Sequence, residues 1–354
     1  HTDGAIFSFP VVFEDTIISS AKVACGCCLA EIHVKYQEKR EKTAMEKEKD
    51  GGGWVTTKQP RELTEAEKRK LAEDGTCVSE FKQNKLELEA KKNWDLFYKR
   101  NSTNFFKDRH WTTREFEELI AESREGKQKS LLEVGCGVGN TVYPLLDASP
   151  EIFIHCCDFS PRAVQFVKEH SAYDPARVNA FQCDITCDDL TNNIAASSVD
   201  MATMFFVLSA IHPDKMLQSI QNIYKALCPG GLVLFRDYGL HDHAMLRFSK
   251  GHKLSENFYV RQDGTRAFYF STDVLSDLFI KAGFDVVVNE YVYRETVNKK
   301  EGLSVPRVFL QSKFSKKIKE DRREFMTPIY TRLFCNFRSV LFMGIKRIHD
   351  TNIQ

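Results

Sequence analysis

The sequence lacks an excess of charge of either sign: its 354 residues carry a formal net charge of +1. Global charge therefore gives no reason to expect a nucleic-acid partner, and any basic surface must be local. An apolar run of membrane-spanning length is also missing, so we expect a soluble protein with no membrane partner. The 42% of apolar residues supply enough core for one large domain with appendages.

The cysteines lack the regular spacing of a disulfide framework. Eleven are present without a repeated C-x-x-C pattern, and Cys156, Cys157 and Cys183 fall in or beside apparent core strands. This usage favours reduced thiols and a cytoplasmic protein, with the nucleus as a second compartment. The dense group between Cys25 and Cys28 has no second ligand pair at finger spacing, so we expect no metal site.

Composition divides the chain into four parts. Residues 1–62 contain a charge-dense run and a triple glycine, and we expect a poorly ordered appendage. We expect a helical segment over 63–125 and a sheet domain over 126–313, with an insertion at 239–270. Residues 314–354 form a basic tail without a clear core role, whose first cations are Lys316, Lys317, Lys319, Arg322 and Arg323.

Apolar runs and helical patterns alternate along the sheet domain, which predicts a doubly wound parallel sheet. The expected strands are 130–134, 152–157, 178–182, 199–206 and 232–236, and the helices between them 140–147, 161–169, 187–194 and 213–227. The insertion predicts a hairpin around residues 262–265. A helix over 272–282 and an antiparallel pair, 284–293 and 305–312, are expected to end the domain.

The segment before the sheet domain reads as a series of helices. Thr64 and Glu67 have the spacing of a capping box, which predicts a helix through Leu71. Two more helices are expected, over 78–99 and over 113–123.

The stretch Leu131–Asn140, LLEVGCGVGN, predicts a strand that enters a glycine turn and then a helix. A dinucleotide fingerprint requires G-x-G-x-x-G, but Asn140 stands where its third glycine would be. The observed G-x-G-x-G spacing behind an acid fits the S-adenosylmethionine turn of class I methyltransferases better.

Acidic residues stand at the ends of three successive predicted strands, where open parallel sheets bind their ligands. Asp158 can accept both ribose hydroxyls, and Asp184 can accept from the adenine amino group while Ile185 covers the ring. Glu133 precedes the glycine turn and is expected to support it. Each acid alone is also compatible with a helix cap, for which Asp158 before Ser160 is well placed. The three acids together with the turn favour an S-adenosylmethionine-dependent methyltransferase.

Motifs outside the glycine turn resemble those of the tRNA N3-methylcytidine methyltransferases. They are NWDLFYK (93–99), FFKDRHW (105–111), CDFSPRAV (157–164), FVLSAIHPDKM (206–216), LFRDYGLHDHAMLRF (234–248) and ENFYVRQDGTRAFYF (256–270). The resemblance covers residues 63–313. It implies a class I methyltransferase (Rossmann-like) sheet of seven strands, parallel with one C-terminal antiparallel strand, and an N-terminal helical cap that binds tRNA.

The resemblance also implies a reaction, methyl transfer from S-adenosylmethionine to N3 of cytidine 32 in the anticodon loop. The branch that modifies serine tRNAs is the most similar, which implies seryl-tRNA synthetase as a helper. Cytosine N3 has a lone pair in its neutral form, so the enzyme has to position the base and exclude water rather than activate a nucleophile. The base must be unpaired and turned out of its stack, because N3 lies on its pairing edge.

We assign site residues on the motifs and on residue chemistry. Asp237 is expected to accept from the cytosine amine, and Arg236 to anchor a phosphate or orient Asp237; a purely structural Arg–Asp pair is the alternative. The residues expected at the cofactor are Trp94, Tyr98, His110, Glu133, Gly135, Gly137, Gly139, Asp158, Phe159, Asp184, Ile185 and Phe205. Those expected at the RNA are Lys99, Arg100, Lys107, Arg109, Arg247, Arg261, Arg266, Arg294, Lys299 and Arg307.

Other functions remain open on the sequence alone. A methyltransferase acting on a small molecule or a protein could use the same sheet, since fold does not fix substrate. Threonine or arginine tRNAs would point to sister branches of the family. An RNA-binding pseudoenzyme is disfavoured because all three cofactor acids are present, and a dehydrogenase is disfavoured by Asn140.

Overall fold

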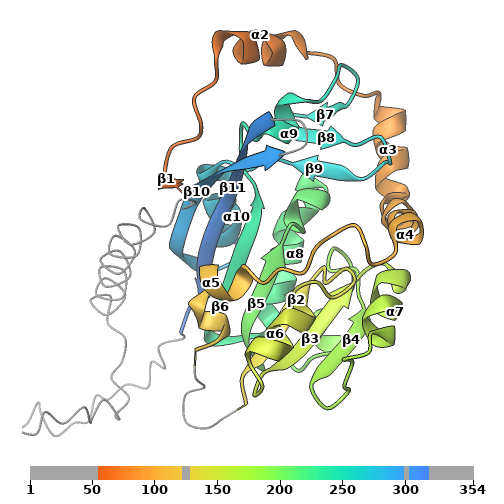
Figure 1. The fold of residues 1–354 in the computed structure, drawn as a ribbon, viewed down its shortest axis with the longest axis vertical. Coiled ribbons are helices and arrows are strands. Elements are labelled where there is room, and N and C mark those ends of the chain that lie inside the picture. The colour runs from red at the N-terminus through yellow and green to blue at the C-terminus, as the bar shows by residue number, and fades with distance from the viewer. Residues whose placement is uncertain (1–54, 122–127, 299–302, 319–354) are drawn as a thin grey trace, which may run out of the picture. The chain divides into compact units, whose positions relative to one another are not determined.

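The computed structural model describes residues 55–121, 128–298 and 303–318, and these residues form an eight-stranded sheet with helices on both faces (Figure 1). The strand order is β1-β10-β11-β6-β5-β2-β3-β4. The strands are β1 Val55–Thr57, β2 Ser130–Val134, β3 Phe153–Asp158, β4 Val178–Gln182, β5 Val199–Phe205, β6 Leu227–Tyr238, β10 Phe284–Asn298 and β11 Leu303–Lys316.

The topology confirms the predicted class I methyltransferase fold. Strands β2 to β6 pair in parallel, and β11 is antiparallel to both of its neighbours, β6 and β10. The predicted count of seven strands was one too low, because β1 adds to the edge of the sheet, antiparallel to β10. Strand β1 falls within residues 1–62, over which we expected a poorly ordered appendage. The earlier part of that prediction, residues 1–54, lies outside the described residues.

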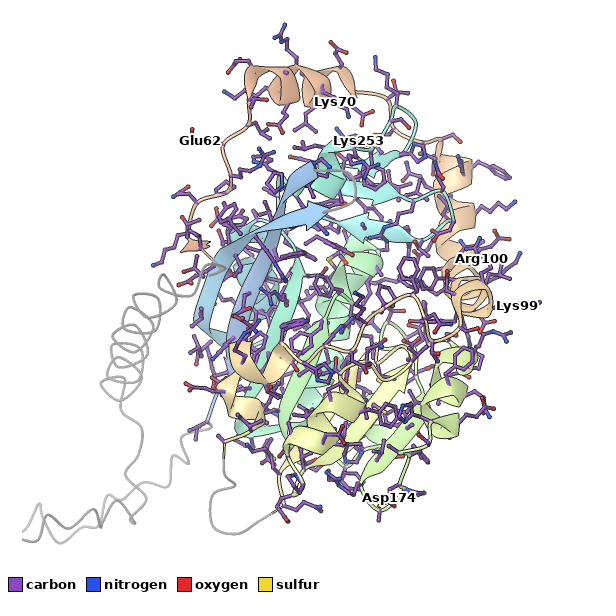
Figure 2. All side chains as sticks on the ribbon, in the orientation of Figure 1. Glu62, Lys70, Lys99, Arg100, Asp174 and Lys253 are labelled. Atoms are coloured by element: carbon purple, nitrogen blue, oxygen red, sulfur yellow. The ribbon has the colours of Figure 1, made fainter. Side chains whose placement is uncertain are left out.

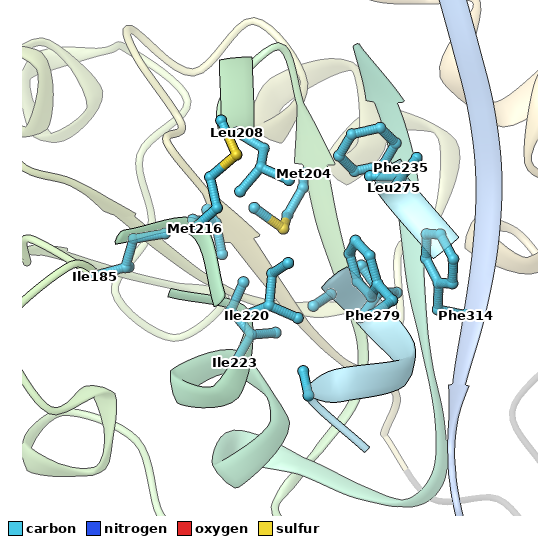
Figure 3. Packing of buried hydrophobic residues seen from close by; sticks show 14 of the residues in the cluster. Ile185, Met204, Leu208, Met216, Ile220, Ile223, Phe235, Leu275, Phe279 and Phe314 are labelled. Carbon is cyan, nitrogen blue, oxygen red and sulfur yellow. The ribbon is translucent and has the colours of Figure 1, made fainter. Parts of the chain in front are cut away.

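Two hydrophobic cores cover the two faces of the sheet. Helices α8 (Pro213–Ala226) and α10 (Thr272–Lys281) pack on one face, where Met216, Ile220 and Phe279 meet strand residues (Figure 3). Helices α6 (Val142–Ala148) and α7 (Pro161–Glu169) pack on the other face. Alternate residues of the central strands supply each core, which is the pattern of a sheet buried on both sides.

The N-terminal helices differ from the prediction in two places. The capping box of Thr64 and Glu67 is present, and it starts α2 (Glu65–Glu73) as predicted. The single helix expected over 78–99 is two helices, α3 (Glu80–Leu88) and α4 (Ala90–Asn101), which meet at Glu89. The helix expected over 113–123 is only the short α5 (Thr112–Glu115) and a 3₁₀ turn, η2 (Glu117–Leu119), because Phe116 leaves helical geometry and is fully buried.

The insertion forms a small sheet of its own and confirms the predicted hairpin. Strands β7 (Lys253–Ser255), β8 (Phe258–Val260) and β9 (Arg266–Phe268) pair antiparallel after the short helix α9 (His243–Leu246). This insertion lies along the N-terminal segment. The contacts include His241 Nδ1 with the Arg61 carbonyl at 2.6 Å and the Val78 amide donating to the Lys253 carbonyl at 2.8 Å.

The first residues assigned to the basic tail belong to the sheet instead, since β11 continues to Lys316 and Phe314 is fully buried in the core. Lys316 ends β11 and is buried, and its ammonium donates to the carbonyl oxygens of Tyr224 and Leu227, at 2.7 Å each. The sequence reading was wrong here because a cation that satisfies the end of a helix looks like a surface charge. Lys319, Arg322 and Arg323 lie outside the described residues.

Candidate active site

The glycine turn follows β2, and its three glycines have positive φ angles of 62°, 54° and 92° at Gly135, Gly137 and Gly139. L side chains rarely adopt such angles. A Cβ on Gly135 would also come within 2.5 Å of Val207, and one on Gly139 within 2.5 Å of the Tyr143 ring. Packing as well as backbone conformation therefore requires glycine at these two positions.

Asp158 at the end of β3 holds the turn in place. One carboxylate oxygen accepts from the Gly137 amide at 3.0 Å and the other from the Ser160 amide at 2.9 Å. Burial raises the pKa of Asp158 to about 6, against the opposing effect of these hydrogen bonds. The N-cap of α7 is Ser160, whose side chain accepts from the Ala163 amide, so the alternative that Asp158 is itself the cap is wrong.

The loop after β4 presents Asp184 and Ile185, and a buried side chain of α8 holds it. Asp184 accepts from both the amide and the hydroxyl of Thr186, at 3.0 and 2.7 Å. Asn222 donates to the carbonyls of Ile185 and Asp188 and accepts from the Leu190 amide. Sequence reasoning missed Asn222, because nothing local marks a helix residue that binds a loop more than thirty positions away.

These elements enclose a first cavity of about 410 Å³, a volume typical of small-molecule sites. The cap helices α3 and α4 form one of its sides. Seven of the residues predicted at the cofactor line it, namely Trp94, Tyr98, Gly135, Asp158, Phe159, Asp184 and Ile185.

Helix α4 is fixed over the first cavity by a polar contact with α7. Asp95 accepts from the Ser160 hydroxyl at 2.9 Å and from the Arg162 guanidinium at 3.3 Å. One turn further along, Tyr98 is buried, and burial raises the pKa of its hydroxyl well above its usual value. The neutral phenol therefore stands beside the glycine turn, where a Cβ on Gly137 would lie 3.1 Å from its oxygen.

A second cavity of about 260 Å³ adjoins the first and shares part of its wall, including Trp94, Tyr98, Gly135, Phe206, Ala210 and Arg266. Its lining is basic and aromatic. The cations are Lys107, Arg109, Arg261, Arg266 and Arg307, and the aromatic residues beyond the shared ones are Phe106, Trp111, Phe205, Tyr238 and Phe309. Such pairs of cations and ring faces suit phosphate groups and unstacked bases.

Phe206 lies at the junction of the two cavities and was not predicted. Its φ of 61° is unusual for a bulky residue, and its ring lies 5.3 Å from that of Tyr238. No sequence pattern indicates such a backbone conformation at the end of β5. The predicted strand, 199–206, ends one residue too late, since β5 ends at Phe205 and the chain turns at Phe206.

Glu133 lies beneath the turn and faces Arg109. Burial raises the pKa of Glu133 to about 7, while the nearby guanidinium of Arg109 and a hydrogen bond from Thr141 oppose the rise. We expected Arg109 to contact RNA. Its guanidinium donates to the Phe205 carbonyl at 3.3 Å in the wall of the second cavity, and its contact with RNA stays a prediction.

The predicted catalytic pair lies behind the wall of the second cavity rather than in it. Asp237 is fully buried, and its carboxylate accepts from the amides of Ser209 and Tyr238, at 2.9 Å each. Arg236 points elsewhere, with its guanidinium 4.5 Å from the Trp111 ring centroid, and it is 1% exposed. Neither side chain is among the described residues that line these two cavities, so Asp237 supports the wall through its backbone contacts, and its contact with the base and that of Arg236 with a phosphate stay predictions.

The remaining predicted site residues lie in three kinds of environment: outside the two cavities, paired with carboxylates, or exposed at the surface. His110 is exposed and Gly139 packs on Tyr143, and both lie outside the linings of the two cavities. Arg266 and Arg307 are engaged with carboxylates, Arg266 with Glu87 and Arg307 with Asp242. Lys99, Arg100, Arg247 and Arg294 are exposed, with Lys99 and Arg100 projecting from the outer side of α4 (Figure 2), and Lys299 lies outside the described residues.

The donor set fits S-adenosylmethionine. The first cavity joins a glycine turn to carboxylates at the ends of two neighbouring strands, which suit the hydroxyl and amino groups of an adenosine. In the described part of the chain, no cluster of His, Cys, Asp and Glu side chains is arranged to hold a metal ion. The same part contains no helix that is long and apolar enough to cross a membrane.

Comparisons with known proteins identify the family. A methyltransferase domain model matches residues 132–233. The human tRNA N(3)-cytidine methyltransferase METTL6 is 63% identical over 259 residues, which are 73% of this chain and 91% of the relative. The zebrafish METTL2 enzyme is 40% identical and covers 74% of this chain and 84% of its own. The fission-yeast enzyme trm141 is 44% identical and covers 68% and 97%. With this identity over nearly the whole relative, and with the cofactor cavity in place, the chain belongs to the S-adenosylmethionine-dependent tRNA N(3)-cytidine methyltransferases.

Proposed function

We propose that this protein methylates N3 of cytidine 32 in the anticodon loop of serine tRNAs, with seryl-tRNA synthetase presenting the substrate. The observation that carries the proposal is the high identity to relatives named METTL6, 63% against 40% for the METTL2 relative. A cytoplasmic site of action, shared with the nucleus, agrees with the free cysteines of the described residues.

The two adjoining cavities support this chemistry. When bound in the first cavity, S-adenosylmethionine supplies an electrophilic methyl group to the N3 lone pair. Acceptance of that methyl group at N3 would leave the cytosine ring with a positive charge. Because the two cavities share part of their wall, a base in the second cavity would lie next to a cofactor in the first.

The chain's own residues position the base rather than activate it. Phe206 and Tyr238 offer ring faces for stacking, and faces of this kind also stabilise a ring that becomes positive. Asp237 fixes the backbone of Ser209 and Tyr238, and so keeps that wall in register. Lys107 and Arg261 at the same cavity suit the phosphates on either side of an everted nucleotide.

The test is transfer of labelled methyl groups to unmodified serine tRNA, with and without seryl-tRNA synthetase. Matched transcripts carry C32 or U32, and threonine and arginine tRNAs are run in parallel. We expect label only with C32 and a higher rate with the synthetase. The label is located by nucleoside mass spectrometry.

A variant shows whether the methyl transfer is catalysed by this protein or by a contaminating enzyme. Asp158→Ala removes the carboxylate that holds the glycine turn, so its label should disappear while tRNA binding persists. Label on threonine or arginine tRNA instead of serine tRNA would refute the specificity. An equal labelling rate with and without seryl-tRNA synthetase would refute the role of the synthetase in presenting the tRNA.

A further inference from the structure

Glu87, near the end of α3, faces cations from two distant parts of the chain. Its carboxylate forms ion pairs with Lys215 of α8 and with Arg266 of β9. Burial alone would raise the pKa of Glu87, but hydrogen bonds from Lys215 and Arg266 outweigh it and keep the pKa below its usual value. The carboxylate is therefore charged at neutral pH, and all three side chains line the first cavity.

Arg266 belongs to both cavities. Its side chain is 6% exposed, and its second terminal nitrogen donates to the Ala210 carbonyl at 3.2 Å. Ala210 also lines both cavities, and the Phe258 ring lies under the guanidinium at 5.6 Å. Glu87 thus holds a side chain that forms part of the wall facing the second ligand.

Helix α3 depends on such contacts for its position. It contains no fully buried residue, and its hydrophobic support comes from Leu86, which is partly buried against the main core. A second polar contact joins the neighbouring helix α4 to the hairpin of the insertion: the side-chain amide of Asn93 donates to the Gly264 carbonyl at 3.2 Å. Segments with so little burial have low local stability, so a bound ligand can stabilise them.

We propose that Glu87 is a positioning residue that couples the two cavities, so that cofactor and RNA each strengthen the binding of the other. A cofactor in the first cavity packs against Glu87 and Leu88 and stabilises α3. Glu87 then fixes Arg266 in the wall of the second cavity. Because α3 is already ordered, RNA binding no longer includes the entropic cost of ordering it. By thermodynamic linkage, RNA raises the affinity for the cofactor by the same factor by which the cofactor raises the affinity for RNA.

The first measurement needs no variant. Calorimetry gives the Kd of S-adenosylhomocysteine alone and in the presence of a saturating equimolar pool of unmodified serine, threonine and arginine tRNA transcripts. We expect the Kd to fall about fivefold or more with RNA, the range usual for coupled sites. The pool makes the result independent of which tRNA is the substrate. A wild-type ratio of one overturns the proposal, whereas the labelling assay tests the function separately.

Three variants locate the coupling. Glu87→Gln should bring the ratio of the two Kd values close to one, while Glu80→Gln, an exposed acid on the same helix, should leave it unchanged. Lys215→Met breaks the other ion pair of Glu87 and should keep most of the coupling. A purely structural role for Glu87 would weaken cofactor binding equally with and without RNA, and so leave the ratio intact.

Thermal unfolding shows whether Glu87→Gln is folded. If it is not, Arg266→Lys is used in its place. The planar guanidinium of Arg266 reaches Glu87 with one nitrogen and the Ala210 carbonyl with the other, and a lysine ammonium has no such pair of nitrogens. Persistence of the wild-type ratio in a folded Glu87→Gln or Arg266→Lys protein overturns the proposal.

Discussion

At the scale of single residues, the sequence located the side chains at or near the end of a strand and missed those that act across the fold. Asp158 is the last residue of β3 and Asp184 lies two residues after β4, and both strands have a clear apolar pattern. Asn222 binds a loop that lies 32 to 37 positions earlier, and Glu87 binds Arg266 179 positions away. No periodicity carries such information. The burial of Arg236 and Asp237 was not visible either, since a motif does not tell which strand face is buried.

Asn222→Ala should weaken cofactor binding without affecting the chemical step. The change leaves the Ile185 and Asp188 carbonyls and the Leu190 amide without their partner. Since the loop carries Asp184, we expect the KM for S-adenosylmethionine to rise about tenfold, and stability to fall by about 2 kcal/mol. Steady-state kinetics with saturating tRNA give KM and kcat separately. Ser219→Ala on the same helix is the control, because its hydroxyl donates within α8. An unchanged KM in Asn222→Ala would refute the role.

Cofactor binding should depend on pH through the buried carboxyl groups. Burial raises the pKa of Glu133 to about 7 and that of Asp158 to about 6, so both bind protons more tightly in the folded protein than when unfolded. Their contribution to the stability of the cofactor-free protein therefore declines as pH rises from about 4 to 7. The bound cofactor favours the ionised forms, so the increase in Tm caused by S-adenosylhomocysteine should be larger at pH 8 than at pH 6.

Glu133→Gln provides the comparison for this pH effect. It removes the group with the higher pKa, so the remaining rise in the Tm shift should centre near pH 6 rather than between 6 and 7. Scanning calorimetry from pH 5.5 to 8.5 measures it. An equal Tm shift at every pH would contradict the assignment of these carboxyl groups to the cofactor site.

At the scale of elements, the sheet was predictable and the cap was not. Strands β2 and β4 have the predicted bounds, because buried parallel strands are short apolar runs between turn signals. The break at Glu89 and the loss of helix after Glu115 depend on packing, and Phe116 enters the core at the expense of helical geometry. Tertiary contacts override local propensity at both points.

Lys316→Met tests whether the end of β11 is structural. The ammonium donates to two carbonyls at the C-terminal end of α8 and lies 4.5 Å from the Tyr224 ring centroid. Met keeps most of the volume but loses both hydrogen bonds, so we expect a loss of about 2 kcal/mol in the free energy of unfolding. Lys317→Met, which breaks an exposed pair with Asp285, should change it by less than about 0.5 kcal/mol. Urea unfolding compares them; weaker RNA binding with unchanged stability would restore the reading of Lys316 as a surface cation.

At the scale of the whole molecule, the near-zero net charge and the basic second cavity have to be considered together. The formal charge of +1 provides little long-range attraction for RNA, so affinity must come from local cations. Arg266 and Arg307 already face carboxylates, which reduces their effect on a phosphate. Lys99 and Arg100 lie exposed on the outer side of α4, beside the cap of the first cavity (Figure 2).

RNA binding should therefore depend on salt through a few cations, while cofactor binding should not. Each phosphate contact contributes a slope of about −0.7 to −0.9 in a plot of log K against log salt concentration. Replacing both Lys99 and Arg100 by alanine should make the slope for tRNA less negative by about 1 to 2 and leave the Kd of S-adenosylhomocysteine unchanged. Lys281→Ala on α10, away from both cavities, is the control and should keep the wild-type slope. Anisotropy titrations of labelled tRNA between 50 and about 300 mM salt measure these slopes. If the double variant kept the wild-type slope, α4 would cover the cofactor without contacting RNA, and the phosphate contacts would have to come from the cations of the second cavity.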